Sequence, residues 1–575
     1  MSTILAKFKQ NITDDFISSL DSPVRELVIE AQGAGYANGD TIVFTGDGEA
    51  ASGKVWTDAQ GRVTYTSITE GGRYVTLPNV SITTANGFGA VITPKIENDH
   101  FYLYAGRSKP FDAEPARDPN YENDYDSFFF QYEQMLYGKK ISNTDVAYMA
   151  RVVEWKANTV FVEYDDKDRQ LPEKDFYVLT TDNHVFKCIT NNSGAPSLIE
   201  PANTQPTGLP TQLADGYRWK YLYSITGQDN TKFKTPSFMP VKANANVAES
   251  AIDGGVLNIK VEAGGTNYPA FSGQVSSTQG GNIIVLPSDA SSVPNFYANC
   301  TVTVFGAGNA VTNRRILSSG VQGNNKIITV ASNFNANQVN DGYQFSIAPS
   351  LVVTGDGSGF EGFLKMNATN RSVIGVEIVD PGSNYHQATA VAIAGTGFGS
   401  GAKLRAVIAP RGGHGSDVYG ELYCKHMGIS GEFANTLGFP VDVTIRTVGI
   451  LKNPQFANGA PYTTFKFNQT VTMSTANTSN RLFTPGETII GNASQARGQV
   501  AFCNTSQTII TGYIGTFIPG EVATGQTSNA QLTINALNNT ADLKMYSGDV
   551  VYLQNISPTP RNKTSSEQIK LIIKL

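Results

Sequence analysis

The chain has 575 residues, a formal net charge of −6, and charged residues at only 16% of its positions. Its length allows about four domains and several apolar cores. With 25 Tyr and 30 Phe residues, the composition argues against a disordered chain, which carries more charge and fewer aromatic residues. The sequence contains no block of basic residues that would indicate a nucleic-acid partner. It also contains no run of about 18 apolar residues, so no membrane helix is predicted.

Glycine, with 56 residues, and many Thr, Ser and Asn residues take the place of the missing charges. This composition is typical of many short strands joined by tight turns. We therefore expect a mainly β fold, with a discontinuous, β-sandwich-like framework, a few short helices and inserted small β-repeat modules.

The N-terminal segment has helical periodicity. In residues 4–20, ILAKFKQNITDDFISSL, apolar side chains recur close to helical spacing, which predicts a short amphipathic helix. The first residues lack the apolar core of a signal peptide, so we expect synthesis in the cytoplasm. The widely separated cysteines favour buried free thiols over disulfides or a metal site. They are Cys188, Cys300, Cys424 and Cys503.

A glycine-punctuated pattern recurs along the chain. Its copies begin at Gly33, Gly71, Gly264, Leu351 and Gly382. Each combines strands with glycine turns, and several place a tyrosine after the glycines, as in GAGYANGD and GGRYV. Glycine supplies the positive φ that tight turns need. Since repeated strand-turn-strand units bury their apolar faces against neighbouring copies, we expect two β-repeat modules of one kind, at residues 26–97 and 255–410.

A different repeat follows later in the chain. FTPGETIIGNASQARGQV begins at Phe483, and FIPGEVATGQTSNAQLTI begins 34 residues later at Phe517. Pro-Gly-Glu is typical of a turn, and the Val, Ile and Thr residues are typical of strands. We expect a third inserted β-repeat module at residues 456–542.

The remaining pieces predict one discontinuous framework domain, because insertions are tolerated where chain ends meet at a surface. These pieces are residues 1–25, 98–254, 411–455 and 543–575. Within them, residues 126–141 predict a helix, with Asp126 as N-cap and Gly138 near its end. Residues 146–155 fit a strand or a helix, and residues 158–166 predict a strand.

Three short motifs lie in the framework. The first contains Gly106, Arg107, Ser108, Pro110 and Phe111, in the pattern Gly-Arg-Ser-x-Pro-aromatic. The second is Asp-Gly-Tyr-x-Trp-x-Tyr-Leu, from Asp215, Gly216, Tyr217, Trp219, Tyr221 and Leu222. The third begins with Ser547, Gly548 and Asp549 and continues through Pro558 and Pro560 to Glu567 and Ile569.

In this order, the motifs resemble those of the baseplate wedge subunit conventionally numbered eight of T-even-type contractile-tail bacteriophages. The resemblance covers the framework and leaves the modules out. It implies a structural virion protein of the viral tail baseplate, made in the host cytoplasm. It further implies a homodimer that contacts other baseplate wedge subunits, without catalysis and without a cofactor or metal.

The motif residues also have a physical interpretation. The strand YRWKYLYSI places Tyr217, Trp219, Tyr221 and Tyr223 on one face, where they pack on a core or on a partner subunit. Arg107, which follows a glycine, braces a carboxylate or fixes a loop. Both interpretations favour structural or interface roles for the motif residues.

Two stretches carry several ionisable residues. HGSDVYGELYCKH (residues 414–426) contains two His and one Cys, but a zinc site needs a fourth ligand and tighter spacing. DDKDR (residues 165–169) predicts a solvated turn. Neither stretch predicts a catalytic or metal site.

The sequence leaves two functions to compare, while the absence of a signal peptide disfavours a third, a secreted β-repeat adhesin. The first is a structural wedge subunit that links neighbouring wedge proteins during baseplate assembly and during contraction triggered by host attachment. The second is a tail-associated carbohydrate-binding or depolymerising protein, which the Gly/Asn/Thr-rich modules and the many tyrosines suggest. A glycoside hydrolase needs only two carboxylates, which a sequence does not reveal. A depolymerase would release saccharide, whereas a wedge subunit would only bind other wedge proteins.

Overall fold

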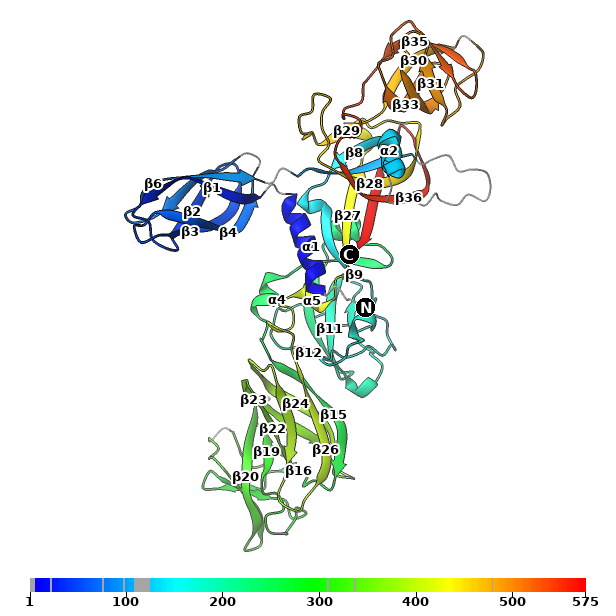
Figure 1. Cartoon of the computed structure of the whole chain (residues 1–575). Helices are drawn as coiled ribbons and strands as arrows, with labels where there is room; N and C mark the ends of the chain where they lie inside the picture. Colours follow the sequence, from blue (N-terminus) through cyan, green and yellow to red (C-terminus); the bar gives the residue numbers. More distant parts are fainter. Residues whose placement is uncertain are drawn as a thin grey trace. The chain divides into compact units, whose positions relative to one another are not determined.

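The structure is a computed structural model that describes residues 6–20, 23–74, 77–96, 99–107, 125–307, 310–335, 338–477 and 479–575. It is 51% strand and 8% helical, so the predicted mainly β fold is confirmed. The chain forms two compact units, one from Met1–Ala147 with His426–Leu575 and one from Tyr148–Lys425. Figure 1 labels their elements. The helices are α1 (Ala6–Ser19), α2 (Tyr125–Gln134), α3 (Gly227–Phe233), α4 (Ala245–Glu249) and α5 (Val418–Glu421), with 3₁₀ turns at Asn143–Asp145, Leu171–Glu173, Asn192–Gly194 and Asn435–Leu437.

The predicted N-terminal helix is confirmed as α1. Its apolar residues Phe16 and Ile17 pack against the core of the first unit. The ring of Phe16 meets that of Phe101 edge to face, with centroids 4.8 Å apart. The apolar side chains of the amphipathic pattern therefore lie on the buried side of the helix.

Residues 24–96 fold into two small sheets that share one apolar core. Their strands are β1 (Val24–Ala34), β2 (Thr41–Thr45), β3 (Glu49–Thr57), β4 (Val63–Arg73), β5 (Asn79–Thr83) and β6 (Phe88–Ile96). β1 pairs with β6, and the other strands are ordered β4-β3-β2-β5. Ile42 and Val55 from the larger sheet and Ile92 from the smaller one are buried in a single cluster.

A tyrosine seated on a glycine explains the Gly and Tyr of this repeat. A Cβ at Gly87 would lie 2.3 Å from the Tyr36 ring. The Tyr36 hydroxyl accepts a hydrogen bond from the Ala90 N–H at 3.2 Å. In the other repeat region, a Cβ at Gly399 would lie 2.2 Å from the Tyr268 ring, whose hydroxyl accepts a backbone hydrogen bond at 3.2 Å. Only glycine leaves room for either ring.

The second unit contains the same strand pairing. The corresponding strands are β15 (Val256–Thr266), β22 (Gln344–Gly355), β23 (Ser358–Met366), β24 (Val373–Ser383), β25 (Ala388–Ile393) and β26 (Ser400–Ile408). β15 pairs with β26, β23 with β24 and β22 with β25. In the first unit β1 pairs with β6, β3 with β4 and β2 with β5. The two repeat regions therefore share these three strand pairings.

Between β15 and β22 the chain carries a further β structure. Its strands are β16 (Phe271–Gln274), β17 (Ser277–Gln279), β18 (Ile283–Leu286), β19 (Cys300–Phe305), β20 (Val311–Gln322) and β21 (Asn325–Val330). They bury their own cluster, which includes Ile284, Val302 and Ile328. Sequence analysis did not separate this part, because it lacks the Gly-Tyr repeat.

The framework of the first unit is a sheet with the order β29-β8-β7-β28-β36, beside which β27 pairs with β37. These strands are β7 (Phe101–Gly106), β8 (Met135–Lys140), β27 (His426–Phe433), β28 (Val443–Lys452), β29 (Lys466–Asn468), β36 (Asp549–Arg561) and β37 (Glu567–Lys574). Leu103, Ile450 and Leu571 are buried in one core. The C-terminal residues therefore form a structural strand.

The helix predicted over residues 126–141 is wrong in its second half. α2 ends at Gln134, and strand β8 begins at Met135. β8 lies between β7 and β29 in the sheet. A Cβ at Gly138 would lie 2.3 Å from the Phe467 ring, so this glycine makes room for a cross-strand ring and does not end a helix. Burial within the sheet overrides local helical propensity here.

Residues 471–537 form a closed barrel with the strand order β30-β33-β32-β31-β34-β35. The strands are β30 (Val471–Asn477), β31 (Thr488–Gly491), β32 (Arg497–Cys503), β33 (Gln507–Ile514), β34 (Val522–Gly525) and β35 (Gln531–Leu537). In chain order, β30 to β32 span the first sequence repeat, and β33 to β35 span the second. Phe483 and Phe517, at equivalent repeat positions, are both buried in the barrel core.

Each barrel repeat supplies a glutamate that caps a turn of the other repeat. Glu487 accepts hydrogen bonds from the Ser528 hydroxyl at 2.7 Å and from the Thr527 and Ser528 N–H groups, each at 2.9 Å. Glu521 accepts from the Ser494 hydroxyl at 2.8 Å and from its N–H at 2.9 Å. Burial opposes ionisation of both carboxyls, but these hydrogen bonds, together with one from the Ile518 N–H to Glu521 and one from the Thr484 N–H to Glu487, outweigh it and lower both pKa values.

The second unit also contains strands outside the repeats. They are β9 (Val146–Arg151), β10 (Tyr177–Leu179), β11 (His184–Asn191), β12 (Thr211–Gln212), β13 (Tyr217–Ser224) and β14 (Phe238–Val241). β9 pairs with β14, and the others are ordered β10-β11-β13-β12. Of the two structures considered for residues 146–155, the strand is observed as β9.

The strand predicted over residues 158–166 is wrong. The Val162 N–H donates to the Asp175 carbonyl at 2.9 Å, and the Tyr164 N–H donates to the Cys188 carbonyl at 2.8 Å. Because these acceptors belong to separate segments, no single strand runs beside this stretch.

The division into one framework and three modules stays a prediction. The structure places β29, which pairs with β8, in the framework sheet, although residues 456–542 were assigned to the third module. Among the described residues, no helix is long and apolar enough to cross a membrane.

Candidate functional site

The Asp-Gly-Tyr motif ties a surface loop to strand β13. Asp215 Oδ2 accepts hydrogen bonds from the Leu198 and Ile199 N–H groups at 2.8 and 3.1 Å. Its Oδ1 accepts from the Tyr217 N–H at 3.1 Å. Gly216 has a φ of +86°, in the left-handed region that favours glycine. The motif therefore fixes the conformation of the loop.

The aromatic residues of the motif complete this connection. The Tyr217 hydroxyl donates to the Ala195 carbonyl at 2.6 Å and accepts from the Phe161 N–H at 3.3 Å. The Trp219 ring stacks on that of Tyr217, with centroids 5.5 Å apart. Trp219 and Tyr221 are both buried. Of the two roles considered for this aromatic strand, core packing is therefore the one observed.

The loop that the motif holds exposes apolar side chains. Leu198 is 57% exposed and Ile199 is 40% exposed. Val160, which is 51% exposed, follows Thr159, and Thr159 forms an isolated β-bridge with Ser197. We call Val160, Leu198 and Ile199 the apolar loop patch. Exposed apolar side chains on a fixed loop are typical of a contact surface.

Gly106 and Arg107 connect β7 to its neighbours through the backbone. The Arg107 N–H donates to the Gln134 carbonyl at 2.9 Å, and the Arg107 carbonyl accepts from the Thr447 hydroxyl at 3.3 Å. A Cβ at Gly106 would lie 2.7 Å from the Thr447 hydroxyl oxygen. Burial, with nearby Arg446, lowers the pKa of Arg107 to about 10. Ser108, Pro110 and Phe111 lie outside the described residues.

Ser547, Gly548 and Asp549 form the turn that starts strand β36. The Ser547 hydroxyl donates to the Lys544 carbonyl at 2.6 Å and accepts from the Gln455 N–H at 3.0 Å. Gly548 has a φ of +77°. Asp549 pairs with Lys452 in the β28–β36 register. This motif, like the other two, joins segments far apart in the sequence.

No protein-family model matches this chain, and no curated protein matches its sequence. The roles given to the motif residues therefore rest on their geometry. The resemblance to the phage wedge subunit remains an expectation. The structural roles of the motif residues are compatible with it but do not test it.

A cluster of ionisable side chains is enclosed in the second unit. Lys187 Nζ lies 2.7 Å from Glu421 Oε2 and 2.9 Å from His414 Nδ1. It also lies 3.9 Å from the centre of the Tyr164 ring. The side chains of Lys187 and Glu421 are 0% and 3% exposed, and that of His414 is 2% exposed. A substrate has no access to groups buried so completely.

The charges of this cluster compensate each other. Burial lowers the pKa of His414 to about 4, and Lys187 adds to the effect. Burial also opposes ionisation of Glu421, but Lys187 outweighs it and the pKa of Glu421 falls to about 2. Burial lowers the pKa of Lys187 too, and Glu421 opposes that change. The 2.7 Å contact between Lys187 and Glu421 is that of a charge-assisted hydrogen bond, and His414 beside it is neutral at neutral pH. Such a buried pair rigidifies a fold when all its members have partners.

The turn predicted at residues 165–169 is exposed at Lys167 and Arg169, as a solvated turn should be, whereas Asp165 at its start lies in an ion-pair network. Asp165 is 13% exposed and lies 2.8 Å from Lys260 Nζ and 2.6 Å from Arg405 Nη2. Burial raises the pKa of Asp165, but the hydrogen bonds from Arg405 and Lys260 outweigh it and hold the pKa well below its usual range. Lys260 and Arg405 lie on β15 and β26, so the network ties the repeat region to the segment before it.

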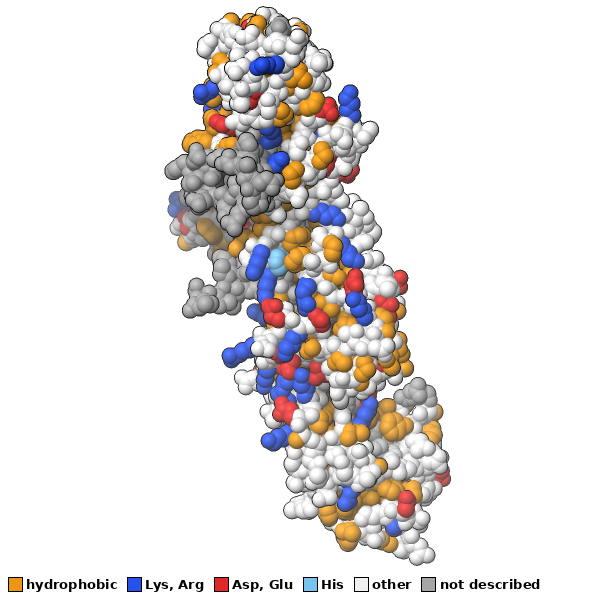
Figure 2. All heavy atoms as spheres, turned by 90° about the vertical axis from the view of Figure 1, so that its right-hand side faces the viewer, with side chains coloured by type: hydrophobic (Ala, Val, Ile, Leu, Met, Phe, Trp, Pro, Cys, Tyr) orange, Lys and Arg blue, Asp and Glu red, His pale blue; other side chains and the backbone are white. Residues whose placement is uncertain are grey.

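Among the residues that the structure describes, no group of three or more His, Cys, Asp and Glu side chains has the arrangement of a metal site. The four cysteines are free thiols. On the face shown in Figure 2, basic and acidic side chains are intermixed, and uncharged groups cover most of the surface. That face therefore has no continuous basic surface for a nucleic acid.

Two features of the structure were not predicted from the sequence. The first is the Lys187 cluster, for which the signal was a lysine inside the apolar strand HVFKCITN. The second is an exposed pair of aromatic residues, Trp56 and Tyr65, on adjacent strands. The sequence feature that could have revealed this pair is one aromatic residue shortly before a short turn and another shortly after it.

Proposed function

We propose that this protein is a structural subunit of the baseplate wedge of a contractile phage tail. It links neighbouring wedge proteins during assembly and keeps the baseplate ready for contraction on host attachment. The observation that carries the proposal is the Asp-Gly-Tyr motif, which fixes the apolar loop patch on the surface of the second unit. A fixed loop loses little conformational entropy when a partner covers it.

The buried ionic clusters support the same proposal. They hold their charges in closed networks, which gives rigidity to parts that must transmit force. The proposal includes no substrate turnover and no cofactor. Tail contraction requires contacts that exist in two arrangements, and rigid subunits with discrete contact patches suit such an assembly.

The proposal also includes a homodimer within the virion. Symmetric pairing is the commonest form of oligomer, and a permanent contact should bury at least about 1,000 Å². Analytical ultracentrifugation of the purified chain tests the dimer. A single monomeric species at micromolar concentration would count against it.

The test of the wedge function removes the apolar loop patch. We expect the double variant Leu198→Ser/Ile199→Ser to lose at least about tenfold in co-sedimentation with the other wedge proteins encoded beside its gene. The control is Leu317→Ser on β20, because Leu317 is also 57% exposed. Unchanged melting of both variants excludes unfolding as the cause.

Two results would overturn the proposal. One is co-sedimentation of the double variant equal to that of the Leu317→Ser control. The other is release of saccharide by the purified chain, abolished by a single carboxylate substitution, which would favour a depolymerising tail protein.

A further inference from the structure

The outer face of the sheet β4-β3-β2-β5 carries two large exposed aromatic side chains. Trp56 is 46% exposed and Tyr65 is 61% exposed. They lie directly opposite each other in the β3–β4 register. Neighbouring positions on this face are occupied mainly by small polar residues. We call this surface the aromatic face, and it comprises Thr41, Val43, Thr45, Lys54, Trp56, Tyr65, Ser67, Ser81 and Thr83.

A β-bulge places Tyr65 on this face. The register steps from Thr57 opposite Val63 to Trp56 opposite Tyr65, so β4 contains one extra residue. Val63 is fully buried, and strict alternation would direct Tyr65 to the same inner face. The extra residue reverses that direction, as bulges do where a side chain must be re-aimed.

The equivalent position in the second unit shows that the fold does not require these aromatic residues. There β23 and β24 have the same register step, from Met366 opposite Val373 to Lys365 opposite Gly375. The bulge is therefore common to both repeat regions, whereas the Trp–Tyr pair is specific to the first. An exposed Trp–Tyr pair that the fold does not need points to binding.

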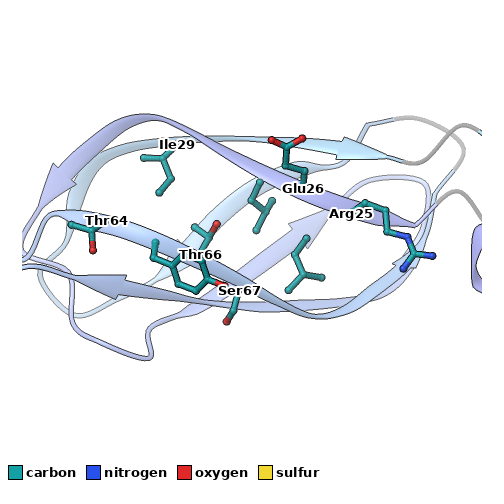
Figure 3. A pocket seen from close by; sticks show the side chains of 9 residues that line it. Arg25, Glu26, Ile29, Thr64, Thr66 and Ser67 are labelled. Carbon is teal, nitrogen blue, oxygen red and sulfur yellow. The ribbon is translucent and has the colours of Figure 1, made fainter. Parts of the chain in front are cut away.

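A groove adjoins the aromatic face and shares Tyr65 and Ser67 with it. It has a volume of about 500 Å³ and lies between β1 and β4. Figure 3 shows side chains that line it, with Arg25, Glu26 and Ile29 on one strand and Thr64, Thr66 and Ser67 on the other. Among the described residues, β1 pairs only with β6 and β4 only with β3, so backbone polar groups line the groove as well.

The chemistry of the face and groove selects an uncharged, hydroxyl-rich ligand. Aromatic rings bind the apolar C–H faces of sugar rings, and hydroxyl and backbone groups bind their hydroxyls. The acid at the groove already has a basic partner, because Glu26 pairs with Lys95 at 2.9 Å. The other basic residues of the site are Arg25 in the groove and Lys54 on the aromatic face, and two separate charges do not form the cluster that a strongly anionic ligand needs.

We propose that the aromatic face and its groove form a binding site for a neutral polysaccharide. Trp56 and Tyr65 stack on successive sugar rings, and Thr64, Thr66 and Ser67 bind their hydroxyls. The site binds and does not cleave. This function is additional to the wedge role and gives the virion a contact with a cell-surface glycan.

The experiment is affinity electrophoresis of the full chain in native gels that contain dextran, mannan, galactan or the anionic polymer alginate. We expect at least one neutral polymer to retard the wild-type protein. Trp56→Ala and Tyr65→Ala should each weaken that retardation by about tenfold or more. The control is Phe88→Ala, because Phe88 is a 68% exposed aromatic residue of the same module that lies outside the aromatic face.

Two further measurements exclude other causes of a change in retardation. Thermal melts of all variants exclude unfolding of the module, and assays for new reducing ends separate binding from cleavage. No retardation by any of the three neutral polymers would overturn the proposal. So would retardation that is unchanged in both aromatic variants, equal loss in Phe88→Ala, or retardation by alginate alone.

Discussion

At the scale of single residues, the enclosed Lys187 cluster is the feature most sensitive to its surroundings. Lys187 lies on β11, while His414 and Glu421 come from a segment more than 200 residues later. The Tyr164 ring covers the lysine, and Lys220, itself buried, lies near enough to lower the pKa of His414 further. The neutral form of His414 is therefore a condition for stable packing of the second unit.

Acidification should destabilise the second unit through His414. The unfolded histidine has a pKa of about 6.5, whereas the folded one has a pKa of about 4. Between these values the unfolded state binds more protons, so stability falls as pH falls. We expect a loss of about 2 kcal/mol between pH ~7.5 and pH ~5.

Urea unfolding at these two pH values measures the effect. A Trp56→Phe background confines tryptophan fluorescence to Trp155 and Trp219 of the second unit. The variant His414→Gln should reduce the pH dependence, since Gln does not titrate. An equal pH dependence in that variant would show that another group is responsible.

The glutamates of the barrel give a second prediction at this scale. Glu487→Gln should destabilise the barrel by roughly 1–3 kcal/mol, because the amide turns a donor toward N–H groups that need an acceptor. Glu521→Gln should cost a similar amount, since the two turns are equivalent by the repeat. Hydrogen–deuterium exchange at the N–H groups of residues 527 and 528 should rise in Glu487→Gln. Gln526→Glu, an exposed change in the same turn, serves as the control and should leave exchange unchanged.

At the scale of elements, strand β37 protects the core of the first unit. It pairs along its whole length with β27, and Leu571 is 3% exposed. Arg561, at the end of β36, is 1% exposed, forms an ion pair with Glu567 and donates to the Phe433 carbonyl at 3.1 Å. The turn between β36 and β37 is thus held by a buried charge pair.

Truncation after Lys563 should make the protein aggregate. It removes β37, exposes the edge of β27 and leaves Arg561 buried without its partner, a loss of about 3–5 kcal/mol for the charge alone. Soluble yield and light scattering measure the outcome. Glu567→Gln in the full chain separates the charge effect from loss of the strand, and it should be destabilised but remain soluble. A truncated chain that stays soluble with native far-UV circular dichroism would contradict the prediction.

At the scale of the whole molecule, the barrel is inserted where two chain segments meet. The Asn538 N–H donates to the Thr472 carbonyl at 2.8 Å, and the Thr472 N–H donates to Asn539 Oδ1 at 2.6 Å. The segment just before the barrel belongs to the framework, because the rings of Tyr462 and Phe467 lie 5.8 and 5.7 Å from that of Tyr102. The insertion boundary therefore lies inside the predicted range 456–542.

Two replacements test this boundary. Exchanging residues 471–537 for a short Gly/Ser linker should leave the rest of the chain folded, because closing a loop costs little extra as its length changes. Exchanging residues 456–542 also removes β29 and the Tyr462 and Phe467 rings, so it should lower the melting temperature of the framework by several degrees. Differential scanning calorimetry compares the two. Unfolding of both would show that the barrel shares its core with the framework, where Ala501 and Ile509 already make contact.

The sequence by itself determined the features that depend on near neighbours. The helix α1, the glycine turns, the barrel repeat and the alternating C-terminal strand all follow from local periodicity or from residues with special backbone preferences. The mainly β fold class was also predictable from local features, because composition and turn residues indicate many short strands when they are counted over the whole chain.

Only the tertiary structure decided which distant segments meet. Met135 begins a strand because β7 and β29 enclose it, and Asp165 is largely enclosed because Lys260 and Arg405 contact it. The Lys187 cluster exists only because β11 meets a segment more than 200 residues later in the chain. The free energy of these contacts comes from removing specific side chains from water together, and no single segment of the sequence contains that information.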